Sequence, residues 1–139
     1  MSENIVELSN LEVNFKIRQG FVNEYIKRDK KTVRAVDKIN LNIGRGEIVS
    51  LVGESGSGKT MTVMSIINVL PKNAFIEDGS IIFNNGNISK LNNSEMKKIR
   101  GKKIFSIFQN PINCFNQSIT MGNQLYDLIS SNMDIKSYN

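Results

Sequence analysis

The chain has 139 residues, of which 40% are hydrophobic and 22% are charged, and its formal net charge is +5. That size and composition are those of one soluble globular domain, and no apolar run approaches the roughly 18 residues that a membrane-spanning helix needs. The single cysteine, Cys114, cannot form an internal disulfide, and because the sequence has no histidine, a thiol-based enzyme is not expected.

Two alternating apolar patterns in the first part of the chain predict an antiparallel pair of strands. Apolar and polar residues alternate within residues 5–15 and largely alternate over residues 33–43, and residues 44–47 supply a turn. The basic stretch of residues 16–34, which lies between the two strands, carries much of the positive charge. This stretch is interpreted as a solvated loop or, alternatively, as a contact for an anionic partner.

The next segment predicts a buried strand followed by a buried helix. Residues 47–53 are almost continuously apolar, which is typical of a strand covered on both faces of a sheet. Residues 59–71 are apolar on nearly every side of a helix, and Pro71 is expected to end that helix. We therefore expect both elements in the interior of the protein.

Shorter elements are expected in the second half of the chain. Residues 80–83 predict a strand, followed by a turn at Asn85 and Gly86. Residues 93–101 predict a short amphipathic helix with Ser94 as its N-cap and Gly101 as its stop. The last two expected elements are an apolar strand and a helix with one apolar face, over residues 103–108 and 121–130.

The sequence GESGSGKT, residues 53–60, matches the phosphate-binding pattern G-x-x-x-x-G-K-S/T in full. It follows the predicted buried strand and opens the predicted helix, where backbone N–H groups and the positive end of a helix can surround a polyphosphate. The glycines leave room for that approach, Lys59 supplies positive charge for the β- and γ-phosphates, and Thr60 supplies a hydroxyl for Mg²⁺. The pattern predicts a nucleoside triphosphate and Mg²⁺, but it does not select the reaction. A glycine-rich turn with an incidental lysine is the alternative.

Three stretches of the sequence resemble the ATP-binding subunit of ABC transporters, and within that family the branch that imports oligopeptides, dipeptides or nickel. They are residues 35–60, 70–89 and 99–125, of which the last, with IRG, IFQNP and TMGNQL, is the most specific. The resemblance implies an α/β P-loop NTPase fold with an antiparallel β subdomain and a partial parallel-sheet core. It also divides the chain into the N-terminal part of the ATP-binding domain, residues 1–120, and the start of a helical subdomain, residues 121–139.

The resemblance assigns roles to individual residues. Gln109, in FQNP, matches the Q-loop glutamine that contacts Mg²⁺ or the attacking water, so Lys59 and Gln109 are the expected catalytic residues and Thr60 and Gln109 the expected metal ligands. The alternative is that Gln109 is a plain polar loop residue. Phe15 matches the aromatic residue that stacks on adenine, although it also continues the apolar face of the first strand and could belong to the core. The expected cofactor-binding residues are Phe15, Gly53, Glu54, Ser55, Gly56, Ser57, Gly58, Lys59 and Thr60.

The sequence departs from the family pattern in three respects, of which the first is the longer basic insertion between the first two strands, for which no specific role is expected. Residues 112–117, INCFNQ, have Cys114 and Gln117 where serine and proline are expected, and Cys114 is interpreted as a small inert residue. The LSGGQ-like signature and the Walker B aspartate with its catalytic glutamate do not occur in the sequence. The chain is therefore expected to be an N-terminal fragment, truncated before the signature and Walker B segments, that binds nucleotide without efficient hydrolysis.

The resemblance implies that the intact protein couples the binding and hydrolysis of ATP with Mg²⁺ to the import of oligopeptides, dipeptides or nickel. The implied partners are transmembrane permease subunits, a second ATP-binding subunit and, indirectly, an extracytoplasmic solute-binding protein, with no nucleic acid among them. The expected location is the cytoplasm, on the inner face of the cell membrane. Two alternatives stay open, namely a nucleotide- or partner-binding module without hydrolysis, and another P-loop enzyme such as a nucleotide kinase.

Overall fold

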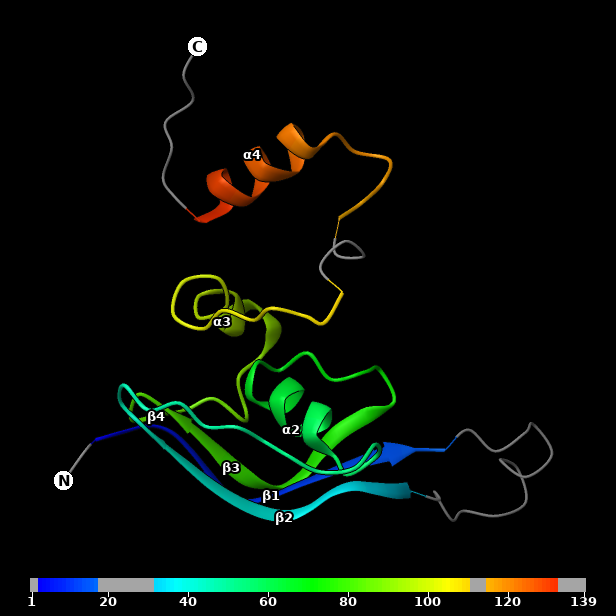
Figure 1. Cartoon of the computed structure of the whole chain (residues 1–139), viewed down its shortest axis with the longest axis vertical. Coiled ribbons are helices and arrows are strands. Elements are labelled where there is room, and N and C mark those ends of the chain that lie inside the picture. Colours follow the sequence, from blue (N-terminus) through cyan, green and yellow to red (C-terminus); the bar gives the residue numbers. More distant parts are fainter. Residues whose placement is uncertain (1–2, 18–31, 111–114, 133–139) are drawn as a thin grey trace. The chain divides into compact units, whose positions relative to one another are not determined.

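The computed structural model of the chain describes residues 3–17, 32–110 and 115–132 (Figure 1). The chain forms two compact units, Met1–Met96 and Lys97–Asn139, and each is described by itself. Most of the basic stretch between the first two strands lies outside the described residues, and so does Cys114. The predicted subdomain boundary at residue 120 stays a prediction.

The first unit is built on one antiparallel sheet with the strand order β2-β1-β3-β4 (Figure 1). The predicted antiparallel pair is confirmed, because β1 pairs with β2 from Asn4 opposite Gly44 to Lys16 opposite Thr32. The strand predicted at residues 80–83 is longer than expected, since it begins at Ala74. The strands of the sheet are β1 Asn4–Lys16, β2 Thr32–Gly44, β3 Ala74–Phe83 and β4 Gly86–Asn87.

The turn between β3 and β4 lies one residue earlier than the sequence predicts. Asn84 and Asn85 occupy its two central positions with φ of 48° and 65°, and Gly86 already pairs with Phe83. Asparagine adopts this left-handed region more readily than most residues, and two such residues in succession form the tight turn that suits a hairpin.

The core of the first unit lies between the sheet and helix α2, Lys59–Ile66 (Figure 1). Leu11 and Val13 on β1 are both 0% exposed, and they share a face because side chains alternate along a strand. Val13 lies opposite Val36 of β2, which is the residue that meets the start of α2. Complete burial of such a side chain contributes roughly 1.5–3 kcal/mol, so this face fixes α2 on the sheet.

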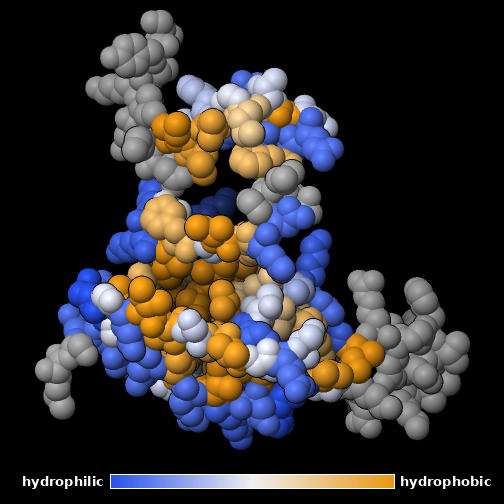
Figure 2. Space-filling view, viewed as in Figure 1, coloured by the Kyte–Doolittle hydropathy of each residue, from blue (hydrophilic) through white to orange (hydrophobic). Residues whose placement is uncertain are grey.

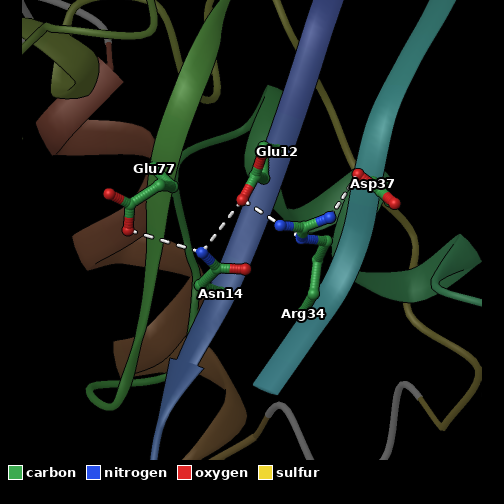
Figure 3. Close-up of polar contacts among 5 residues, drawn as sticks. All are labelled: Glu12, Asn14, Arg34, Asp37 and Glu77. Atoms are coloured by element: carbon green, nitrogen blue, oxygen red, sulfur yellow. Dashed lines mark hydrogen bonds and ion pairs between the residues drawn. The ribbon is translucent and has the colours of Figure 1, made fainter. Parts of the chain in front are cut away.

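The opposite face of the same strands carries a polar network (Figure 3). Glu12 and Asn14 flank Val13 on β1 and are each only 6% exposed. The Nε of Arg34 lies 3.2 Å from Oε1 of Glu12, and its Nη1 lies 3.0 Å from Oδ1 of Asp37. The hydrogen bond to Asp37, the charge of Asp37 and the charge of Glu12 raise the pKa of Arg34, in that order of importance. The network therefore ties the first residues of β2 to β1.

Asn14 extends this network to β3. Its amide Nδ2 donates to Oε1 of Glu12 at 3.2 Å and to Oε2 of Glu77 at 3.4 Å, so that one amide joins two carboxylates (Figure 3). The Oδ1 of Asn14 is buried without a hydrogen-bond partner among the described residues. A buried acceptor without a partner costs stability, so the two amide hydrogen bonds are partly offset.

The predicted buried strand at residues 47–53 is wrong. These residues form no regular structure, and Ile48 and Val52 are 94% and 93% exposed. A strand of this kind depends on neighbouring strands at its edges, and no strand of the described residues pairs with it. The apolar run indicates which kind of strand the segment would form, but a strand also needs neighbouring strands to pair with, and the run contains no information about those.

The predicted helix over residues 59–71 is shorter than expected. Helix α2 ends at Ile66, because Asn68 adopts a left-handed conformation with φ of 52°. The N–H groups of Asn68 and Val69 donate to the carbonyls of Ser65 and Met64, which is the pattern of a Schellman helix end. The expected stop at Pro71 was therefore wrong, as was the full burial of the helix. Its buried residues are Thr62 and Ser65.

The predicted short helix is α3, Asn93–Lys97, so the expected stop at Gly101 is wrong, because the helix ends four residues earlier. Its N-cap is Asn92 rather than Ser94. Oδ1 of Asn92 accepts hydrogen bonds from the N–H groups of Ser94 and Glu95, at 2.9 and 3.0 Å. Oε2 of Glu95 in turn accepts from the N–H of Asn92 at 2.8 Å, which completes a capping box. Asparagine and serine cap helices about equally well, so the sequence alone did not separate the two candidates.

The second unit contains helix α4, Met121–Asn132, which confirms the predicted helix in this region. The predicted strand over residues 103–108 is wrong, because the described residues form only an isolated bridge between Arg100 and Ile104. Phe105 and Ile107 are 76% and 95% exposed, for the same lack of pairing partners. The hydrophobic side chains of α4 are visible at the surface in Figure 2. Among the described residues, no helix is long and apolar enough to cross a membrane.

Candidate functional site

The candidate site is the loop of residues 53–58 together with the first turn of α2. Gly58 is the N-cap residue of α2, with φ of 88°, and the helix begins at Lys59. The first turn carries no acidic residue and Gly58 offers no side-chain cap, so the positive end of the helix has no such compensation. This arrangement is suited to a negatively charged group.

Gly58 holds the loop against strand β2. A Cβ atom at this position would lie 2.5 Å from the carbonyl oxygen of Ala35 and 3.4 Å from Cγ2 of Val36. No side chain fits into that contact, and φ of 88° is itself unfavourable for any residue other than glycine. Gly56 also has a positive φ, of 84°, but a Cβ there would meet nothing within 4 Å. The two glycines therefore serve different purposes, since Gly58 fixes the loop and Gly56 leaves its outer side open.

The side chain of Lys59 folds back onto the loop. Its Nζ donates hydrogen bonds to the carbonyl oxygens of Gly53 and Glu54, at 2.7 and 2.6 Å, and to Oγ of Ser57, at 3.1 Å. The loop itself is exposed to solvent, so the ammonium lies where a phosphate could reach it. Lys59 thus places one positive charge beside the positive end of α2.

Thr60 and the tip of the loop are exposed to solvent. The side chain of Thr60 is exposed in the first turn of α2, where its hydroxyl is available as an oxygen ligand for a hard cation such as Mg²⁺. Glu54 and Ser55 are exposed at the tip of the loop. Among the described residues, no cluster of three or more histidine, cysteine or acidic side chains could hold a metal ion.

Phe15 lies at the end of β1 and lines an open groove of about 660 Å³. It is paired with Val33 of β2 and is half-buried, so it is not simply a core residue. Alternation from Val13 places it on the face of the sheet that α2 covers. Val33 precedes Ala35 by two positions, so the groove begins roughly 7 Å along β2 from the Gly58 contact. The groove is lined by Phe15, Lys16, Ile17, Val33, Lys72 and Asn73.

Gln109 belongs to the second unit, where it is exposed at a bend that follows residues 103–108. The structure brings residues 53–60 together and places Phe15 in the same unit, but it does not place Gln109 relative to them. The roles of Phe15 and Gln109 therefore stay predictions. Sequence reasoning missed Lys72 as a groove residue and the contact of Ser57 with Lys59, because neither has a recognisable pattern of its own.

The loop, the helix that it opens and the antiparallel sheet beneath them are those of a P-loop protein of the α/β class, while the described residues form no parallel sheet of the expected core. The family model "ABC transporter" matches residues 36–138, and the chain belongs to that family. A search of solved structures shows similarity to the dimeric, post-hydrolysis ATP-binding cassette MJ0796 bound to ADP and Pi. The TM-score is 0.58 and the identity 23%, over 90% of this chain and 54% of that one, which supports the fold alone.

Several curated proteins are also similar to the chain. The dipeptide transport ATP-binding protein DppD of Bacillus subtilis is 37% identical over 88% of this chain and 34% of its own length. The oligopeptide transport ATP-binding protein OppD of Haemophilus influenzae is 34% identical over 90% of this chain and 35% of its own length. The chain thus spans about a third of the length of the curated relatives it matches.

Proposed function

We propose that the chain binds ATP with Mg²⁺ as the P-loop part of an ABC importer. The observation that carries this proposal is the position of Lys59, whose ammonium is held over the loop beside the start of α2. A lysine, an uncapped helix N-terminus and exposed backbone N–H groups are together the chemistry that a polyphosphate needs. The similarity to relatives named as ATP-binding proteins supports the choice of ATP.

Each part of the site would have its own task. The backbone N–H groups of residues 53–60 and the Lys59 ammonium would bind the β- and γ-phosphates, and the Thr60 hydroxyl would hold Mg²⁺. The magnesium ion, when bound, would neutralise phosphate charge. Phe15 would stack against adenine in its groove. Gln109 would contact the metal or the attacking water, as in the family it resembles.

We propose that this chain, tested by itself, binds nucleotide without efficient turnover. The loop supplies a cation and a hydroxyl and Gln109 would supply an amide, but phosphoryl transfer to water also needs a carboxylate that acts as general base. None of the hydrogen bonds of Lys59 is to an acidic side chain that could do so. A binding module without hydrolysis is thus the second candidate, while membership of the ABC family argues against a nucleotide kinase.

The proposed transport role and partners follow from the relatives. Proteins named for dipeptide and oligopeptide transport favour peptides over nickel as the imported solute. We propose that the whole protein works with transmembrane permease subunits, a second ATP-binding subunit and an extracytoplasmic solute-binding protein. Its place would be the inner face of the cell membrane. No nucleic acid is among the proposed partners.

Binding and turnover of ATP test the proposal on the same preparation. We expect a fluorescent ATP analogue to bind in the presence of Mg²⁺, and Lys59→Ala to weaken that binding about ten- to a hundredfold through loss of a charged hydrogen bond. Lys90→Ala is the control, because Lys90 is exposed outside the loop. Equal affinity of the Lys59 variant and the control would refute the proposed site, and rapid phosphate release by the wild type would refute the slow turnover.

A further inference from the structure

All three N–H donors of the Lys59 ammonium group are engaged in hydrogen bonds in this structure. A lysine ammonium has three donors, and each is used, two by the carbonyl oxygens of Gly53 and Glu54 and one by Oγ of Ser57. The contact with Ser57 is the longest of the three, at 3.1 Å, and the only one made to a side chain. A phosphate oxygen can therefore gain a hydrogen bond from Lys59 only if one of these acceptors is released.

Ser57 is the acceptor that can be released at the lowest cost. The carbonyls of Gly53 and Glu54 belong to the backbone and cannot rotate away without moving the loop, whereas a serine hydroxyl turns about one bond. The Ser57 backbone is itself fixed, because its N–H donates to the carbonyl of Glu54 at 3.3 Å. Rotation of the side chain therefore changes the Lys59 contact and leaves the loop in place.

The glycine at position 53 is explained by the same contact. A Cβ atom on Gly53 would lie 2.9 Å from Oγ of Ser57 and 3.8 Å from Nζ of Lys59. Gly53 does not have a positive φ, so backbone conformation alone does not require glycine there. The space above Gly53 is used by the Ser57 hydroxyl and the Lys59 ammonium.

We infer that Ser57 is a positioning residue whose hydroxyl holds the Lys59 ammonium over the loop and gives way to a phosphate oxygen of the nucleotide. The inference rests on the proposed function, since it concerns the same site. Its consequence is that the Ser57 hydroxyl competes with the nucleotide for one Lys59 proton. Removal of the hydroxyl therefore strengthens nucleotide binding, which is the opposite of what loss of a direct ligand contact would do.

The first test compares three variants with the wild-type chain, using a fluorescent ATP analogue with Mg²⁺ as the probe. We expect Ser57→Ala to lower the Kd about two- to fivefold, which corresponds to one modest hydrogen bond. Ser57→Thr keeps the hydroxyl and is expected to restore the wild-type Kd. Ser94→Ala, an exposed serine in α3, is the control for loss of a hydroxyl elsewhere. An unchanged or higher Kd for Ser57→Ala overturns the inference.

A second test needs no nucleotide and so separates this inference from the proposed function. The ammonium of Lys59, assigned in NMR spectra by its loss in Lys59→Arg, is expected to exchange its protons with water faster in Ser57→Ala than in the wild type or in Ser94→Ala. Equal exchange rates would overturn the inference even if ATP binds. Faster exchange in a chain that does not bind ATP would leave the Ser57 contact established and refute the proposed function instead.

Discussion

Gly58 offers the sharpest test of how the loop is held. Gly58→Ala introduces a Cβ at φ of 88° and only 2.5 Å from the carbonyl oxygen of Ala35, whereas Gly56→Ala introduces one at φ of 84° with nothing within 4 Å. The left-handed conformation costs a non-glycine residue about 1–2 kcal/mol, and the stiffer unfolded chain offsets about 0.4–1 kcal/mol of that. We therefore expect Gly56→Ala to lower the free energy of unfolding by about 1 kcal/mol.

Gly58→Ala must in addition push α2 away from β2. Overpacking of this kind costs about 1–3 kcal/mol, so the total loss for Gly58→Ala is expected to be about 2–4 kcal/mol. Urea unfolding, followed by far-ultraviolet circular dichroism, measures both variants against the wild type. The difference between them isolates the contact with Ala35, because both share the unfavourable φ. Equal losses of stability in the two variants would refute the packing of the loop on β2.

Three further predictions concern the sheet, a helix cap and the groove. Arg34→Gln removes the charge that faces the buried carboxylate of Glu12, and we expect it to lower the urea midpoint, which an unchanged midpoint would contradict. Asn92→Ala removes the cap of α3, so we expect it to lower the stability measured in thermal unfolding by about 1 kcal/mol. Ser94→Ala should lower it by almost nothing. A larger loss for Ser94→Ala than for Asn92→Ala would show that the cap is misassigned. Phe15→Ala should weaken binding of the ATP analogue about three- to tenfold and leave binding of inorganic triphosphate unchanged. Weaker binding of both ligands would argue against stacking on the base.

The elements that could be predicted are those whose pattern is local. The alternation in β1 and β2 gave the antiparallel pair, and the spacing of glycines before Lys59 gave the start of α2. The amphipathic pattern likewise predicted α4, Met121–Asn132. In each case the pattern lies within the residues of the element itself.

The elements that could not be predicted depend on contacts the pattern does not contain. The apolar run at residues 47–53 predicts a strand covered on both faces and that at residues 103–108 a further apolar strand, yet the described residues pair neither of them in a sheet. The end of α2 depends on Asn68 in a left-handed conformation, which no periodicity announces. The candidate site was predicted in more detail than the fold, because its motif specifies each residue from Gly53 to Thr60.

Binding of nucleotide phosphates by residues 53–60 can be observed residue by residue. The measurement is an amide NMR titration, in which ATP and Mg²⁺ are added to the chain while the backbone N–H signals are followed. We expect the largest shifts in the N–H signals of residues 53–60 and none in the distant turn at Asn84 and Asn85. In Lys59→Ala the shifts of residues 53–60 are expected to disappear. Shifts confined to other parts of the chain, or undiminished shifts in Lys59→Ala, would contradict this binding.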